Sequence, residues 1–184
     1  IEQWHGAPYK KIDVACATGP WGRLDFIEGL GVGLFTEIMA ELDASGNLDL
    51  AHLAGADDKI ASVQRFLRNH VSHYPAFKMK VFVDGHDLSG EFILMEALNT
   101  QSVGPNLRLA PDANPADGLL DLALFYEDQR DDLISQLVEN GKRTSLPGLP
   151  LVVPRGKRLE LQLQGLPVHI DDEAWPLQNA SSSP

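Results

Sequence analysis

Short runs in which apolar and polar residues alternate recur along this chain, and they constrain its fold more than any other feature. Near the start, Ile12, Val14 and Cys16 alternate with polar or small residues, and the pattern returns at Leu24 and Phe26. A period of two predicts strands with one buried face. Such runs, or short apolar runs bounded by turn residues, occupy positions 11–16, 23–26, 77–83, 91–98, 119–126, 158–163 and 168–170. The sequence therefore predicts a chain built mainly from strands.

Three further segments have the spacing of amphipathic helices. Leu34, Ile38 and Leu42 recur every four residues, which places them on one helical face. Similar apolar stripes run through residues 57–74 and 128–140, and each is followed by a proline or glycine that suits a helix end. Three helices are too few for a fold in which a helix follows every strand.

Tight turns join several of the predicted strands, as expected of antiparallel neighbours. Gly19 and Pro20 separate the first two strands, and Asp84 and Gly85 offer a hairpin turn after the strand over 77–83. The predicted fold class is therefore mainly β with α (α+β), an antiparallel β-sandwich with peripheral helices, and not a doubly wound parallel sheet.

The length of 184 residues and the 43% hydrophobic content suit one domain with a sizeable core. We predict a single domain over residues 1–176. The serine-rich residues 177–184 are predicted to form a disordered tail.

Charge and cysteine content exclude several classes of protein. The formal net charge is -11, with 26 acidic and 15 basic residues, which argues against nucleic-acid binding and disfavours tight docking on anionic membranes. Cys16 is the single cysteine, so no internal disulfide can form. The sequence has no apolar run of the roughly 20 residues that a membrane span needs. We predict a cytoplasmic protein, with peripheral membrane contact and a homodimer left open.

Residues 29–33, a Gly-Leu-Gly-Val-Gly run, stand between a predicted strand and a predicted helix. In that position, glycines can let a backbone approach a phosphate at a helix N-terminus. The spacing is not that of a dinucleotide fingerprint. We favour a flexible glycine turn needed for close strand-to-helix packing.

The segment 112–118 combines oxygen-bearing side chains with a glycine turn, which is what a hard cation prefers. It does not fit the register of an EF-hand, because Ala116 and Ala123 fall where ligands are required. Asp117 with backbone carbonyls could still hold Mg²⁺ or Ca²⁺. On chemistry alone, a surface turn in which Asp117 accepts backbone N–H groups is the stronger interpretation.

Three other clusters contain side chains capable of chemistry. His70 and His73 are spaced as two zinc ligands on a helix, but no third ligand is signalled, so we favour a plain helix surface. The basic run 155–158 could meet phosphate head groups, although a solvated turn is favoured. The acidic run 171–173 could supply a general base, because adjacent carboxylates repel and can raise one pKa, although on chemistry alone a plain acidic turn is favoured.

Several motifs resemble those of the diacylglycerol-kinase and sphingosine-kinase family of lipid kinases. Residues 96–105 and 109–122 resemble a strand, an asparagine, a glycine-containing loop and the motif P-x-A-x-x-x-D-G-x-L-D-V. Upstream, residues 11–14 and 26–33 are similar to that family's first strand and its f-x-N-x-x-G-x-G turn. Downstream, residues 168–173 resemble v-x-x-D-G-E. The order and separation of these motifs agree over nearly the whole chain, most weakly between residues 43 and 75.

The resemblance implies roles for individual residues. Glu173 would be the base that takes the proton from a lipid hydroxyl as that hydroxyl attacks the γ-phosphate of ATP. Asp117, with backbone oxygens of Asn114 and Leu119, would hold a structural Mg²⁺. Asp172 stands where the family has Gly, which removes backbone freedom and adds a negative charge beside Glu173.

The resemblance also implies partners for this domain. The family's G-G-D-G-T phosphate loop is not present in the sequence, so we expect ATP to bind mainly to an N-terminal nucleotide-binding domain outside this chain. This domain would then supply the base and the wall of the acceptor-lipid site, around residues 92–98 and 119–125, and would be inactive alone. The alternatives are a degenerate lipid-binding or regulatory relative and an NAD-kinase-like enzyme. The acceptor could be a diacylglycerol, a sphingoid base or a phosphatidylglycerol-type lipid.

Overall fold

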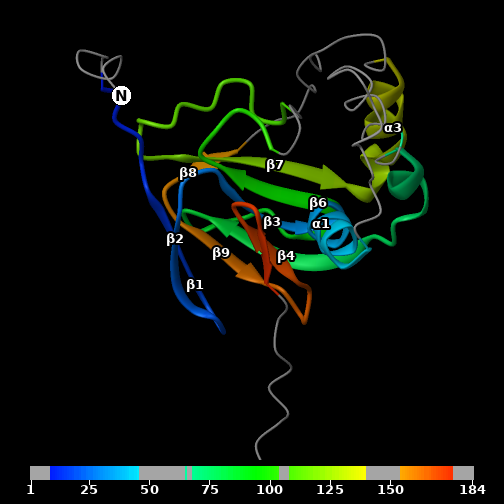
Figure 1. The fold of residues 1–184 in the computed structure, drawn as a ribbon, viewed down its shortest axis with the longest axis horizontal. Coiled ribbons are helices and arrows are strands. Elements are labelled where there is room, and N and C mark those ends of the chain that lie inside the picture. Colours follow the sequence, from blue (N-terminus) through cyan, green and yellow to red (C-terminus); the bar gives the residue numbers. More distant parts are fainter. Residues whose placement is uncertain (1–8, 46–64, 66–67, 104–107, 140–153, 176–184) are drawn as a thin grey trace, which may run out of the picture.

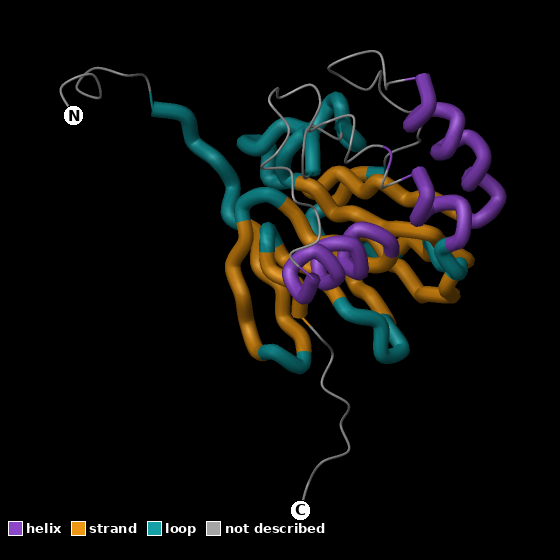
Figure 2. Tube along the Cα trace, turned by 45° about the vertical axis from the view of Figure 1, so that its right-hand side comes forward, coloured by secondary structure: helices purple, strands orange, loops and turns teal. Residues whose placement is uncertain are grey.

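The computed structural model describes residues 9–45, 65, 68–103, 108–139 and 154–175. Strands dominate these residues, and the helices lie together on one side (Figures 1 and 2). The elements are β1 (Ala15–Gly19), β2 (Gly22–Phe26), β3 (Gly29–Gly33), α1 (Leu34–Ser45), β4 (Phe77–Val83), β5 (His86–Asp87), β6 (Gly90–Leu98), β7 (Leu120–Tyr126), the 3-10 helix η3 (Glu127–Gln129), α3 (Arg130–Glu139), β8 (Arg155–Gly156), β9 (Leu159–Gln162), β10 (Val168–Ile170) and β11 (Glu173–Trp175).

Every strand pair in the described residues is antiparallel. The main sheet runs in the order β11-β10-β3-β6-β4-β5, with β7 also beside β6, β8 beside β7 and β9 beside β4. The strand β4 changes partner along its length, because residues 77–79 pair with β6 while residues 80–83 pair with β9. The sheet therefore folds over on itself at β4. The β1–β2 hairpin forms a separate two-stranded sheet, and its Ala17 and Phe26 pack into the core that β4 also lines.

The strand β6 lies at the centre and is buried on both faces. Phe92, Met95 and Ala97 contribute to a core between the layers of sheet. Ile93 and Leu94 contribute to a second core against the helices, and a register shift between Phe92 and Leu94 lets these two neighbours share one face. The helical core also contains Leu34, Phe35, Ile38, Val71, Tyr74, Phe125 and Leu133.

The α+β class with an antiparallel β-sandwich is confirmed, but the glycine-rich segment differs from its prediction. Residues 29–33 form β3, whose five residues are all buried, and not a flexible turn. Pairing with β6 on one side and β10 on the other satisfies the hydrogen-bonding groups of the β3 backbone. Its glycines leave room for neighbouring side chains that approach the strand closely.

The predicted helices are found wherever the structure describes them. The helix α1 begins at Leu34, and α3 follows the short η3 segment. Residues 68–73 are helical and end before Pro75, while most of the remaining residues predicted for that helix lie outside the described part. The predicted tail over 177–184 also lies outside it.

Candidate functional site

A buried ion pair lies beneath the glycine strand. Glu96 on β6 and His169 on β10 are 0% and 2% exposed, and His169 Nε2 lies 3.0 Å from each carboxylate oxygen of Glu96. Gly31 on β3 lies between these two strands, and a Cβ atom at Gly31 would overlap both side chains. The absence of a side chain at Gly31 therefore creates the space in which the pair forms.

The contacts of His169 indicate an imidazolium. Its Nε2 faces Glu96, and its Nδ1 lies 3.1 Å from the backbone carbonyl oxygen of Asp171, so both ring nitrogens face acceptors. Burial by itself lowers the pKa of His169, but the Glu96 charge, the hydrogen bonds and the Asp171 charge outweigh burial and raise it above its ordinary value. A protonated His169 can donate to both acceptors at once.

The turn between β10 and β11 is anchored to the loop between β2 and β3. The Asp171 carboxylate accepts hydrogen bonds from the backbone N–H groups of Ile27, Glu28 and Gly29, at 3.2, 2.8 and 3.1 Å. The Asp171 N–H in turn donates to the Gly29 carbonyl oxygen at 2.8 Å. Together with the His169 contact, these bonds engage the carboxylate, the N–H and the carbonyl oxygen of Asp171.

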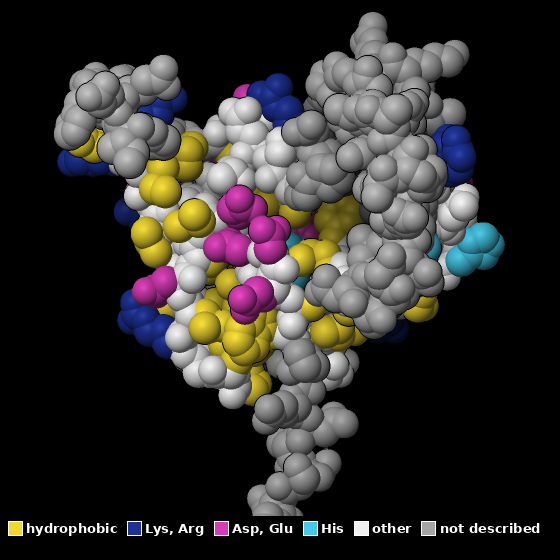
Figure 3. Space-filling model, in the orientation of Figure 1, with side chains coloured by type: hydrophobic (Ala, Val, Ile, Leu, Met, Phe, Trp, Pro, Cys, Tyr) yellow, Lys and Arg dark blue, Asp and Glu magenta, His cyan; other side chains and the backbone are white. Residues whose placement is uncertain are grey.

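Glu173, the predicted base, begins β11 directly after this turn and is exposed. Ile170 pairs with Glu173, so Asp171 and Asp172 form a two-residue hairpin turn. The left-handed residue is Asp171, with φ of 48°, whereas Asp172 has no positive φ. Aspartate in place of the family's glycine at 172 therefore imposes no left-handed strain on the backbone that leads to Glu173. Figure 3 shows acidic side chains gathered near the middle of the face that carries β10 and β11 in Figure 1.

Asn99, at the end of β6, ties the segment before β1 to the loop before β3. Its side-chain amide donates to the Asp13 carbonyl oxygen at 2.9 Å and to the Ile27 carbonyl oxygen at 3.0 Å. The Asp13 carboxylate then accepts the Gly118 N–H at 2.6 Å. These bonds bring four motif segments, far apart in the sequence, to one end of the sandwich.

The predicted metal ligands lie in this junction, and Asp117 has a cationic neighbour. Arg155 Nη2 contacts Asp117 Oδ2, while Asp117 Oδ1 accepts the Leu119 N–H at 3.1 Å. The Asn114 carbonyl oxygen accepts the N–H groups of Ala116 and Asp117, at 2.7 and 3.3 Å. Both carboxylate oxygens of Asp117 and the Asn114 carbonyl are thus engaged within the protein.

The Arg155 guanidinium beside Asp117 opposes a Mg²⁺ ion at the same carboxylate, because the two cations would repel each other. Magnesium requires near-octahedral oxygen ligands at about 2.0–2.1 Å. The described residues contain no group of three His, Cys, Asp or Glu side chains placed to hold a metal. The magnesium site at Asp117, Asn114 and Leu119 remains a prediction from the resemblance, and we derive no step from it.

Arg155 also contacts Asp121, which is almost fully buried. Arg155 Nε lies 3.0 Å from Asp121 Oδ1, and the other oxygen of that carboxylate has no hydrogen-bond partner. Burial raises the pKa of Asp121, and Arg155 opposes this effect only in part. The hydrogen bond to Asp117 raises the pKa of the Arg155 guanidinium, which therefore stays charged.

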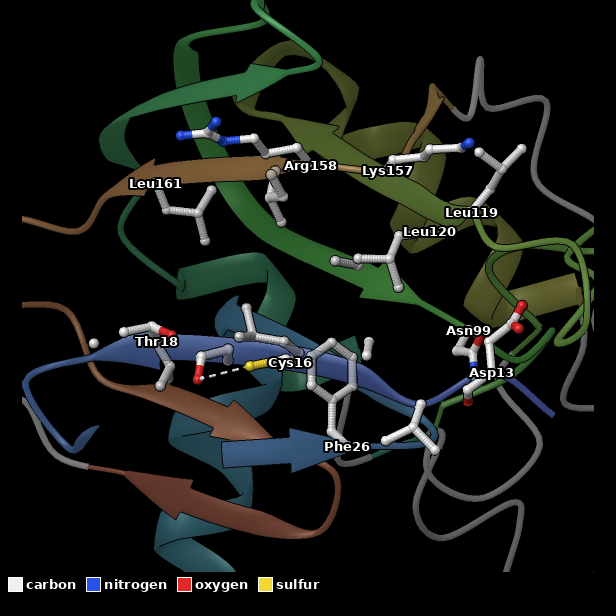
Figure 4. Close-up of a pocket in the computed structure, with 18 of the residues that line it drawn as sticks. Asp13, Cys16, Thr18, Phe26, Asn99, Leu119, Leu120, Lys157, Arg158 and Leu161 are labelled. Atoms are coloured by element: carbon white, nitrogen blue, oxygen red, sulfur yellow. Dashed lines mark hydrogen bonds between the residues drawn. The ribbon is translucent and has the colours of Figure 1, made fainter. Parts of the chain in front are cut away.

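A cavity of about 590 Å³ opens between the β1–β2 hairpin and β9 (Figure 4). Leu161 and Leu120 line it from one layer, and Cys16 and Phe26 line it from the other. Its volume is typical of small-molecule sites, and most of its lining is apolar. Asp13, Asn99 and Leu119 of the junction lie together at one end of it in Figure 4, and Lys157 and Arg158 contribute to the wall that β9 provides.

Several residues of the site carried no usable signal in the sequence. Glu96 and His169 are 73 positions apart, and each sits in a run that predicts only a strand. Asp13 and Asn99 fall within motifs of the resemblance, but their bonds to distant backbone were not predicted. Arg155 was assigned to a solvated basic turn, and it proves to be paired with two acidic side chains.

The zinc interpretation of His70 and His73 receives no support in the described residues. His73 Nδ1 lies 3.1 Å from the backbone carbonyl oxygen of Asn69, one helical turn earlier. No cluster of three candidate ligand side chains is found around it in the part of the chain that the structure covers. The plain helix surface remains the favoured interpretation.

The fold and these sites define an antiparallel β-sandwich domain. It carries an acidic turn held by buried residues, and a cavity between the β1–β2 hairpin and β9. A family model described as "YegS C-terminal NAD kinase beta sandwich-like domain" matches residues 40–181, more than half of the chain. The chain belongs to this family. A comparison with curated proteins finds no match.

Three of the solved structures with the same fold come from Bacillus anthracis str. Sterne. One is described as "The crystal structure of a diacylglycerol kinases" and has 18% sequence identity and a TM-score of 0.58, covering 91% of this chain and 51% of its own. Two others, named provisionally for the same activity, have 19% and 15% identity with TM-scores of 0.58 and 0.51, and they cover 91% and 83% of this chain. This chain spans about half the length of these structures, between 46% and 51%.

These neighbours support the predicted resemblance to the diacylglycerol-kinase-like family at the level of the fold. Among the described helices, none is long and apolar enough to cross a membrane.

Proposed function

We propose that this chain is the C-terminal domain of an ATP-dependent lipid kinase, which transfers the γ-phosphate of ATP to a lipid hydroxyl. The observation that carries the proposal is family membership combined with an exposed Glu173 at the end of a firmly anchored turn. Solved structures with this fold are named as diacylglycerol kinases. Cytoplasmic localisation with peripheral membrane contact remains part of the proposal.

Glu173 would act as the general base. A positioned carboxylate that accepts the hydroxyl proton makes the lipid oxygen a better nucleophile toward phosphorus. The proton would go to Glu173, the new P–O bond would form at the lipid oxygen, and the bond to the ADP leaving oxygen would break. ATP and its Mg²⁺, which neutralises phosphate charge, would be held mainly by an N-terminal nucleotide-binding domain of the same protein.

The anchored turn explains how this domain would contribute to the rate. A general base must lie within hydrogen-bond reach of the hydroxyl proton, so the backbone that carries it must be held in place. The Asp171 carboxylate and the His169 ring hold the turn through four hydrogen bonds. Glu173 would therefore be presented from a fixed backbone.

The cavity would receive the apolar part of the acceptor lipid. Leu120, Leu161 and Phe26 line it, and its lining is more apolar than polar. The acceptor wall was expected from β6 and from residues 119–125. Of these, Ala97 of β6, Leu120 of β7 and Leu119 just before β7 line the cavity. Phe92 and Leu122 lie in the core between the layers and do not line the cavity.

Glu173→Gln in the full-length protein is expected to lower lipid phosphorylation about 100- to 10,000-fold, with lipid binding retained, because glutamine cannot accept the proton. The measurement is ATP-dependent phosphate incorporation into a panel of micellar diacylglycerol, sphingoid base and phosphatidylglycerol, with NAD as a further acceptor. Glu91→Gln, at an exposed glutamate of β6, is the matched control and should keep full activity. Asp172→Gly, which restores the family residue, should be at least as active as the natural protein.

The outcomes distinguish the three interpretations. Incorporation into one lipid that is lost in Glu173→Gln supports the kinase and names its acceptor. Incorporation into NAD supports the NAD-kinase-like alternative. No incorporation by the natural protein, despite bound ATP and lipid, would identify a degenerate lipid-binding relative.

Leu161→Trp is expected to raise the KM for the lipid about tenfold, corresponding to about 1.4 kcal/mol, while the KM for ATP stays unchanged. The indole would fill part of the cavity that Leu161 lines. Gln162→Trp is the matched control, because Gln162 is the next residue of β9 and its side chain is exposed. An equal change in both variants, or a changed KM for ATP, would contradict the assignment of the cavity to the lipid.

A further inference from the structure

Two acidic side chains, Asp117 in the loop before β7 and Asp121 in β7, share a single arginine. Arg155 contacts Asp117 through Nη2 and Asp121 through Nε, the latter at 3.0 Å. The Asp121 side chain is 4% exposed, and the Asp117 side chain is 24% exposed. Two carboxylates so close together, one of them buried, require a cation between them, because their mutual repulsion and the loss of hydration would otherwise destabilise the loop.

The backbone brings the guanidinium to this place. Arg155 on β8 pairs directly with Asp121 on β7, and the Leu122 N–H donates to the Pro154 carbonyl oxygen at 2.8 Å. Cross-strand neighbours have their side chains side by side. The position of Arg155 therefore follows from strand pairing and needs no ion to organise it.

Two backbone N–H groups of the loop donate to acidic side chains. The Gly118 N–H donates to Asp13 Oδ2, and the Leu119 N–H donates to Asp117 Oδ1. The buried Asp121 Oδ2 has no hydrogen-bond partner in the protein. Arg155 thus offsets one of the two negative charges of Asp117 and Asp121, and it is the cation that the described residues place against both side chains.

We propose that the Arg155 guanidinium is the resident cation of the 112–121 loop, standing where the family resemblance predicts a structural Mg²⁺. A guanidinium keeps its charge at any pH at which the protein folds, and its planar donors suit paired carboxylates. The loop of this protein is consequently independent of divalent cations. This inference does not depend on the proposed kinase activity.

The first test is thermal unfolding of the natural protein in excess EDTA and in excess MgCl₂. We expect the same Tm in both solutions. A Tm that falls in EDTA and recovers with Mg²⁺ would show that an ion is resident and would overturn the proposal. This measurement needs no variant, so it decides the question even if the substitutions below prevent folding.

The second test is Arg155→Gln, which removes the charge and keeps a side chain of similar length. We expect Tm to fall by about 5 °C. We also expect the vacated carboxylates to become sensitive to cations, so that Mn²⁺ or Mg²⁺ raises the Tm of this variant. Arg158→Gln is the matched control, because Arg158 is exposed and pairs with an exposed Glu160. Its Tm should be unchanged in every solution.

The third test locates the charge balance. Adding Asp117→Asn to Arg155→Gln should restore part of the lost Tm, because one of the two repelling charges is gone, and it should abolish the response to Mn²⁺. Unchanged stability of Arg155→Gln would overturn the proposal. A Mn²⁺ response that survives Asp117→Asn would place the ion elsewhere and would also overturn it.

Discussion

Replacing His169 with alanine is expected to lower the free energy of unfolding by about 3–5 kcal/mol, the usual cost of leaving one member of a buried ion pair without its partner. Glu96 would remain as a fully buried carboxylate without the ring nitrogen that both of its oxygens now contact. The Asp171 carbonyl would also lose the Nδ1 donor. Urea unfolding monitored by circular dichroism measures the change.

The controls separate the lost charge pair from a lost side chain. His86→Ala, at an exposed histidine of β5, should change the free energy of unfolding by less than about 0.5 kcal/mol. The double variant Glu96→Gln/His169→Gln replaces the ion pair with two neutral amides and should recover much of the loss. If His169→Ala is as stable as the natural protein, the pair contributes nothing to folding.

The same pair gives stability a defined pH dependence. The pKa of His169 is raised in the folded state, so its contribution is fully present below the unfolded pKa of about 6.5 and is lost as pH rises through the raised pKa. The groups that face the ring are the Glu96 carboxylate, the Asp171 carbonyl and, through its charge, the Asp171 carboxylate. Unfolding free energies measured from about pH 6 upward should therefore fall in the natural protein and fall less in His169→Gln.

Gly31→Ala is expected to be the most damaging of the glycine substitutions, with a loss of about 3 kcal/mol, at the upper end for overpacking a core. The added Cβ would overlap His169 Nε2 and both Glu96 carboxylate oxygens. Neither buried side chain can move away without breaking the ion pair. Thermal or urea unfolding of the variant measures the loss.

Two comparisons identify the cause. Gly29→Ala, on the same strand, meets the Leu98 side chain and the Ala97 carbonyl oxygen at longer distances, so it should cost less. In a background of Glu96→Ala/His169→Ala the Gly31→Ala penalty should nearly vanish, because the space would be free, and a double-mutant cycle measures this coupling. An equal penalty in both backgrounds would mean that the glycine is needed for another reason.

Much of the fold followed from local pattern. Alternation predicted the strand over 77–83, and the four-residue spacing after Gly33 predicted the helix that begins at Leu34. Both patterns act through near neighbours in the chain, because side chains alternate along a strand and recur every turn along a helix. The prediction of a turn over 29–33 was wrong for the same reason. A glycine-rich strand and a glycine-rich turn have the same local sequence pattern, and only the partner strands β6 and β10 distinguish them.

The candidate site was likewise predicted from the sequence only in part. By itself, the sequence determined the α+β class, the family resemblance and the presence of Glu173 at the end of an acidic turn. Only the tertiary structure decided that Glu96 and His169 meet beneath Gly31, that Asp171 binds the loop before β3, and that Arg155 joins two acidic side chains. The physical reason is that a side chain's charge and shape are local properties, whereas its partner is decided by tertiary contacts between segments up to 144 positions apart.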